Sequence, residues 1–125
     1  MDISPMEDKM DEKKRVEPIV LRYEDGTVYT LEFSRETVEH AERSGFKRSE
    51  IENHEMTQIP LLFFLAFKMH HPTMSREKAN KIYFEDLGGI SQPLSERLIE
   101  LFNAPYNDLF NESGETKNPN LTVVL

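Results

Sequence analysis

An almost unbroken apolar run, Ile59–Phe67, constrains the fold of this chain more than any other feature of its sequence. The run holds nine residues, far fewer than the roughly 20 that span a bilayer. We expect a helix that follows an N-cap at Thr57, carries Pro60 in its first turn and continues to about His70, where Pro72 ends it. A helix that is apolar on nearly all sides must lie at the centre of a fold or be covered by a partner protein. The sequence leaves both possibilities open.

The segment before this run predicts an antiparallel β-hairpin. Apolar and polar residues alternate in residues 19–23 and 29–33, and an Asp-Gly pair lies between them. A three-residue loop ending at Gly26 pairs Ile19 with Leu31 and Leu21 with Tyr29, which places both apolar sets on one face. A two-residue loop would put polar residues opposite the apolar ones. We therefore predict the three-residue loop, with Gly26 in the left-handed region where glycine has no Cβ penalty.

A short helix is predicted directly after the hairpin, from Arg35 to Ser44. Ser34 is a natural N-cap, because its hydroxyl can accept a hydrogen bond from a free backbone N–H of the first turn. Gly45 ends the helix, and Phe46 follows at the position that packs back on the last turn in a Schellman motif. A single helical turn is expected at Ser49–Asn53.

Two further helices are predicted towards the C-terminus. Thr73 or Ser75 caps a helix of about Arg76–Leu87, which Gly88-Gly89 ends, and Ser91 caps a helix of about Gln92–Asn103. Their inward-facing residues are expected to be Ala79, Ile82, Tyr83 and Leu87 in the first, and Leu94, Leu98, Leu101 and Phe102 in the second.

These elements predict an α+β fold, in which an N-terminal antiparallel β-hairpin precedes a bundle of about four short helices. Residues 16–110 form one domain, between a charged, disordered segment at residues 1–15 and a flexible tail at residues 111–125. The net charge of -8 disfavours nucleic acid and membrane surfaces as partners, because proteins that bind them are usually basic.

No group of residues predicts catalysis, a cofactor or a metal ion. The chain has no Cys, and His40, His54, His70 and His71 lack the spacing of a metal site. We attribute His70 and His71 to the C-terminal dipole of the apolar helix. Gly88-Gly89 lacks the frame of a phosphate-binding loop. We expect a protein that is not an enzyme, with no cofactor and no metal.

The order of these segments resembles the small tail assembly chaperones of long-tailed phages and their prophages, over about Val16–Phe110. The resemblance is carried by the hairpin at residues 19–33, Ser34 and Glu42-Arg43-Ser44-Gly45-Phe46, Ile59-Pro60-Leu61-Leu62-Phe63-Phe64, His70-His71-Pro72, Ser75-Arg76-Glu77-Lys78-Ala79, Asp86-Leu87-Gly88-Gly89 and Leu94–Phe102.

What the resemblance implies is a non-enzymatic protein of the bacterial host cytoplasm, which coats the tape measure protein during tail assembly and is absent from the mature virion. We expect a homo-oligomer that binds the tape measure protein, or another tail protein, through apolar side chains. Two alternatives stay open: a structural virion component, such as a head–tail connector or minor tail protein, and a small regulatory adaptor of the host. The predicted partner-binding residues are Leu61, Phe63, Phe64, Phe67, Leu98 and Phe102.

Overall fold

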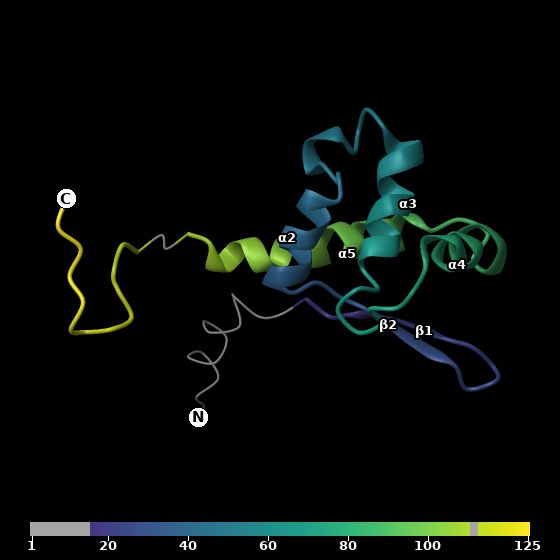
Figure 1. Cartoon of the computed structure of the whole chain (residues 1–125), viewed down its shortest axis with the longest axis horizontal. Coiled ribbons are helices and arrows are strands. Elements are labelled where there is room, and N and C mark those ends of the chain that lie inside the picture. The colour runs from purple at the N-terminus through teal and green to yellow at the C-terminus, as the bar shows by residue number, and fades with distance from the viewer. Residues whose placement is uncertain (1–15, 111–112) are drawn as a thin grey trace, which may run out of the picture.

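The computed structural model describes residues 16–110 and 113–125, and it confirms the α+β fold (Figure 1). A two-stranded antiparallel hairpin comes first and helices follow. The predicted disordered segment at residues 1–15 lies outside the described residues, as do residues 111–112 of the predicted tail. Residues 113–125 contain no helix or strand. The elements in chain order are β1 (Ile19–Arg22), β2 (Val28–Leu31), α2 (Arg35–Arg43), η2 (Arg48–Glu50), α3 (Glu55–Leu65), α4 (Arg76–Lys81), η3 (Ile82–Asp86), α5 (Gln92–Asn103) and η4 (Ala104–Asp108).

The hairpin has the predicted register. Ile19 pairs with Leu31 and Leu21 with Tyr29. The backbone N–H of Tyr23 donates to the carbonyl of Thr27 at 2.8 Å, so three residues form the loop. Gly26 has a φ of 97°, in the left-handed half of conformational space that favours glycine. The apolar face that results lies against the helices.

Helix α2 begins and ends at the predicted caps. The Ser34 side chain accepts from the backbone N–H of Thr37, and the Thr37 side chain accepts from that of Ser34, so two N–H groups of the helix start have partners. At the other end the N–H of Phe46 donates to the carbonyl of Ala41 at 3.1 Å, as in a Schellman motif. This turn directs Phe46 into the core, where 2% of it is exposed. The expected turn at Ser49–Asn53 is displaced slightly, because η2 spans Arg48–Glu50.

Helix α3 is the central helix, but both predicted ends were wrong. It begins at Glu55 with His54 as N-cap, so Pro60 lies in the second turn rather than the first. Because Pro60 has no N–H, the carbonyl of Met56 lacks its usual hydrogen bond within the helix. Met56 is exposed, so the loss of this hydrogen bond costs little. The helix ends at Leu65 rather than His70, because the carbonyl of Ala66 accepts the N–H of Glu32 at 3.0 Å and the chain then turns.

The helix that begins at Arg76 has the predicted cap, Ser75, and its second half is π-helical. Ala79, Ile82 and Tyr83 are buried as predicted. Leu87 is 37% exposed, so its predicted inward orientation was wrong. Helix α5 matches its predicted bounds, with Ser91 as cap.

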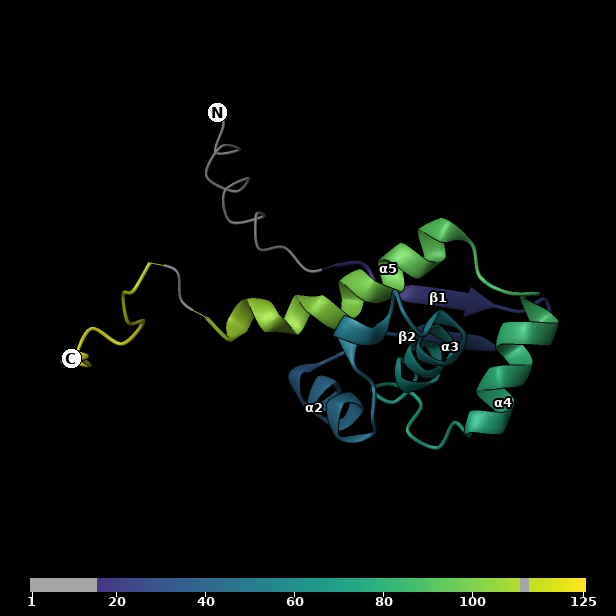
Figure 2. The same ribbon diagram turned by 90° about the horizontal axis from the view of Figure 1, so that it is seen from above.

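The core lies where the apolar face of the hairpin meets the helices. Figure 2 shows α3 between α2 and α4, with α5 crossing the hairpin near the start of β1. The largest fully buried side chains are Phe46, Phe63, Phe67, Phe102, Leu31, Leu62, Leu98 and Leu101. The hairpin and the helices therefore contribute to one core, to which α3 adds Leu62, Phe63 and Leu65.

Candidate partner-binding groove

The residues predicted to bind a partner are mostly part of this core. Phe63, Phe67, Leu98 and Phe102 are each at most 1% exposed, so in this structure they cannot present a surface to another protein. Leu61 and Phe64 are half-buried. Of the two possibilities that the sequence left open for the apolar run, the structure supports the enclosed helix.

Aromatic contacts explain why α3 is enclosed. The ring of Phe63 meets those of Phe67 and Tyr83 edge-on, each at 5.3 Å between centroids. Phe102 lies edge-on to Phe46 at 4.8 Å. Such pairs stabilise a fold beyond the area they bury, and the C-terminal half of α3 is enclosed by other elements while its first turn is exposed.

An open groove lies beside the N-terminal half of α3, between that helix, η3 and the start of α5. Its volume is about 480 Å³. Most of the residues that line it are apolar: Ile51, Met56, Ile59, Pro60, Tyr83, Phe84, Ile90 and Ile99. The polar members of the wall are Glu55, Ser91, Gln92 and Ser95.

The π-helical segment η3 carries an aromatic side chain that lines this groove. The N–H of Leu87 donates to the carbonyl of Ile82 at 2.8 Å, and that of Gly89 to the carbonyl of Tyr83 at 2.9 Å. Within this segment Tyr83 is 9% exposed, while its neighbour Phe84 is 57% exposed. Short π-helical segments are rare and frequently occur at functional sites.

Met56 is the second exposed apolar group on the groove. It is 91% exposed, and it lies in the first turn of α3 because that helix begins at Glu55. Methionine is unbranched and polarizable, so its side chain adapts to apolar surfaces of different shapes. Met56 and Phe84 thus offer apolar contact from two different elements.

Sequence reasoning missed both of these residues. Met56 precedes Thr57, the predicted N-cap, so its exposure on a helix face was not considered. Phe84 carried a signal that could have been used: it falls outside the inward-facing set of its own helix, and an aromatic residue outside that set is expected to be exposed.

The groove carries little charge. Among the described residues that line it, Glu55 alone is charged. A wall with one charged residue can therefore bind apolar groups without desolvating several ions. The net charge of -8 disfavours close approach of another acidic surface.

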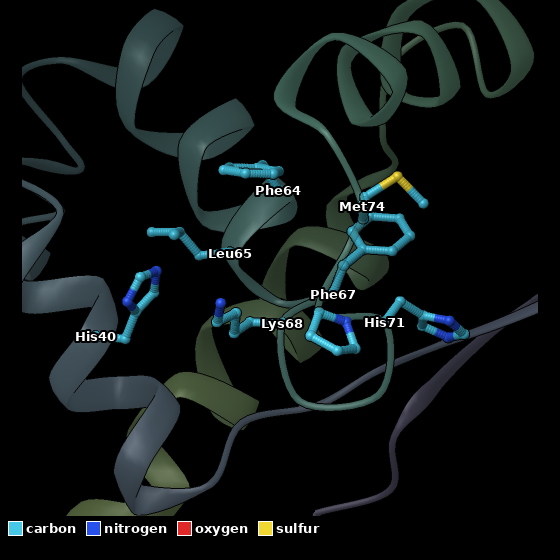
Figure 3. Close-up of a pocket in the computed structure, with 8 residues that line it drawn as sticks. His40, Phe64, Leu65, Phe67, Lys68, His71 and Met74 are labelled. Atoms are coloured by element: carbon cyan, nitrogen blue, oxygen red, sulfur yellow. The ribbon is translucent and has the colours of Figure 1, made fainter.

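The pocket drawn in Figure 3 is too small for a ligand of ordinary size. It encloses about 70 Å³ between α2 and the chain after α3, and His40, Phe64, Lys68, His71 and Met74 are among the residues around it (Figure 3). We regard it as a gap in the packing between these elements.

The four histidines do not form a common metal site. His54 pairs with Glu50 at 2.7 Å and His70 with Glu32 at 2.8 Å. His71 lies against β2. The predicted role of His70 and His71 at a helix C-terminus was wrong, because α3 ends at Leu65. Within residues 16–110 and 113–125, no three potential ligands lie together as a metal site would require, and no helix of that part is long and apolar enough to cross a bilayer.

Comparison with known proteins identifies a family without identifying an activity. A family model described as "Domain of unknown function (DUF5055)" matches residues 10–125. The chain belongs to that family, since the match covers nearly its whole length. No curated protein and no solved structure matches it.

Proposed function

We propose that this member of the DUF5055 family is a non-enzymatic tail assembly chaperone of a phage or prophage, which binds the tape measure protein during tail assembly. The observation that carries the proposal is the groove between α3, η3 and α5, with Met56 and Phe84 exposed on its wall. The proposal moves the binding surface from the core residues predicted from the sequence to this groove.

The groove fits recognition of an amphipathic helix. In that mode, apolar side chains at one- and two-turn spacing enter a hydrophobic groove. The wall supplies apolar contacts from three elements, and Ser91, Gln92 and Ser95 supply hydrogen-bonding groups on the α5 side. An aromatic ring and a methionine give contact without demanding one particular shape, which suits repeated binding along a long client.

The acidic charge supports the same function. A chaperone has to stay dispersed while it exposes apolar surface, and a net charge of -8 opposes association of copies through charge repulsion. We propose that copies nevertheless associate through the groove in the absence of a client, because an open apolar surface is uncommon on a stable monomer.

Co-expression with fragments of the tape measure protein of the same phage tests this function. We expect the wild-type chain to keep at least one insoluble fragment in solution and to co-purify with it. A set of fragments that spans the tape measure protein and never changes in solubility would contradict the proposal.

The same phage supplies a second test, because the chain should be missing from purified virions. Its presence there as a regular component would favour a structural virion protein.

A further inference from the structure

The outer edge of β2 is held by the chain that follows α3. In an antiparallel hairpin every second residue directs its N–H and carbonyl away from the partner strand, and Thr30 and Glu32 do so here. The N–H of Thr30 donates to Nε2 of His71 at 2.9 Å. The N–H of Glu32 donates to the carbonyl of Ala66 at 3.0 Å. The connection between α3 and α4, residues 66–75, therefore covers an edge that would otherwise be open to other strands.

The bond from Thr30 requires a neutral His71. An imidazole nitrogen accepts a hydrogen bond only when it carries no proton, and both nitrogens carry one in the charged form. The ring of His71 is fixed against Tyr29 at 5.2 Å and Phe67 at 6.2 Å between centroids. Partial burial of the ring, together with the neighbouring His70, lowers the pKa of His71.

Other titratable and charged groups lie around His71 on the elements packed near it. From α4, Nζ of Lys78 lies 5.8 Å above the Tyr29 ring that His71 touches. Lys68 and His40 line the small pocket that His71 also borders, with His71 on the far side from His40 (Figure 3). From the hairpin, Glu32 faces the other histidine, His70.

Protonation of His71 removes its link to the hairpin. A proton on Nε2 of His71 places an N–H donor opposite the N–H of Thr30, so the hydrogen bond between them is lost. The neighbouring link between the connection and the hairpin is the 2.8 Å contact of Nε2 of His70 with Oε1 of Glu32.

We propose that His71 and Thr30 form a pH-sensitive latch that fastens residues 66–75 to β2 and releases them when His71 is protonated. In the released state His71 has the ordinary histidine pKa of 6.5, and in the latched state its pKa is lower. The latch therefore contributes fully above about pH 6.5, and its contribution is lost as the pH falls below that value. This inference does not depend on the proposed function.

Amide hydrogen exchange of the full chain tests the latch. At about pH 7.5 the amide of Thr30 should be protected, and at about pH 5.5 its protection relative to that of Leu31 should fall at least about threefold. In a His71→Gln variant, whose side-chain oxygen accepts without titrating, the ratio should not change with pH. In a His70→Gln variant it should fall as in the wild type.

Three results would overturn the latch. The first is a wild-type protection ratio of Thr30 to Leu31 that does not change with pH, and the second is the same fall of this ratio in His71→Gln. The third is a fall in protection that Leu31 shares fully, because the whole hairpin would then be opening. If His71→Gln does not fold, the wild type alone decides by nuclear magnetic resonance. The ring nitrogens of His71 and the amide of Thr30 should titrate together, with a midpoint below about 6.5. Two separate midpoints would contradict the latch.

Discussion

The backbone N–H of Leu87 donates to the carbonyl of Ile82 at 2.8 Å, five residues earlier in the chain. This bond belongs to a π-helical turn, in which Tyr83 enters the core and Phe84 stays exposed on the groove. Their rings lie 4.5 Å apart between centroids. One side of η3 therefore stabilises the fold while the adjacent residue is available for binding, so the two roles can be separated by mutation.

The hairpin loop gives a prediction that concerns the backbone alone. Replacing Gly26 with Val should lower the free energy of unfolding by about 1–2 kcal/mol, because a residue with a Cβ is strained at positive φ. An added Cβ would meet no atom within 4 Å, so crowding does not contribute. Gly26→Asn is the control and should cost less, since Asn tolerates this region better. Equal losses in the two variants, measured by urea unfolding, would contradict this explanation.

Truncation of a core ring should have a much larger effect. Phe67 is fully buried and contacts the rings of Phe63, Tyr29 and His71. We expect Phe67→Ala to lower the free energy of unfolding by about 3–5 kcal/mol, the usual cost of removing a buried phenyl ring. Phe110, which is 77% exposed, provides the matched control, and Phe110→Ala should change stability by less than about 0.5 kcal/mol. A loss below about 1 kcal/mol for Phe67→Ala would show that this position is not enclosed.

The hairpin and η3 are joined by a bond that should fail in alkaline solution. The hydroxyl of Tyr23 donates to Oδ2 of Asp86 at 2.6 Å. Burial, this hydrogen bond and the charge of Asp86 raise the pKa of Tyr23 from 10.0 to about 12. The folded state thus keeps the proton that the unfolded state gives up first. The contribution of Tyr23 is complete below about pH 10 and is lost as the pH rises towards about 12.

A Tyr23→Phe variant measures this contribution. The difference in stability between wild type and variant should be constant up to about pH 9 and should shrink above about pH 10. Taking the difference removes the effect of Tyr83 and Tyr106, whose pKa values are also raised. A difference that does not vary with pH would mean that the Tyr23 hydroxyl does not titrate differently in the folded state.

The parts of the fold that depend on neighbouring residues were predictable from the sequence. The hairpin register follows from matching two apolar sets across Gly26, and the caps at Ser34, Ser75 and Ser91 follow from local hydrogen bonding. The end of α3 was not predictable in this way. It depends on the bond between Glu32 and Ala66, which joins residues far apart in the chain, and residues 66–70 have the composition of a continuing helix.

The binding site was less predictable for a related reason. The density of apolar residues in Leu61–Phe67 shows that much surface must be covered, but it does not say by which element. Side chains from the hairpin, α2, α4, η3 and α5 share its buried cluster, so Phe63 and Phe67 are not available to a partner. The exposure of Phe84 could have been inferred, because Phe84 falls outside the inward-facing set of its helix. The π-helical form of η3 could not, because periodicity based on the α-helix gives no sign of such a turn.

The central claim is that the groove beside Phe84 binds the client. The direct measurement is the affinity of a tape measure fragment that co-purifies with the wild type, determined by calorimetry for wild type, Phe84→Ser and Phe110→Ser. Both variants remove an exposed phenyl ring, but only Phe84 lines the groove. We predict that Phe84→Ser weakens binding at least about tenfold, the cost of losing an aromatic anchor, while its unfolding free energy stays within about 1 kcal/mol of wild type. Phe110→Ser should bind like the wild type. Unchanged affinity in a folded Phe84→Ser protein, or equal losses in the two variants, would contradict the account.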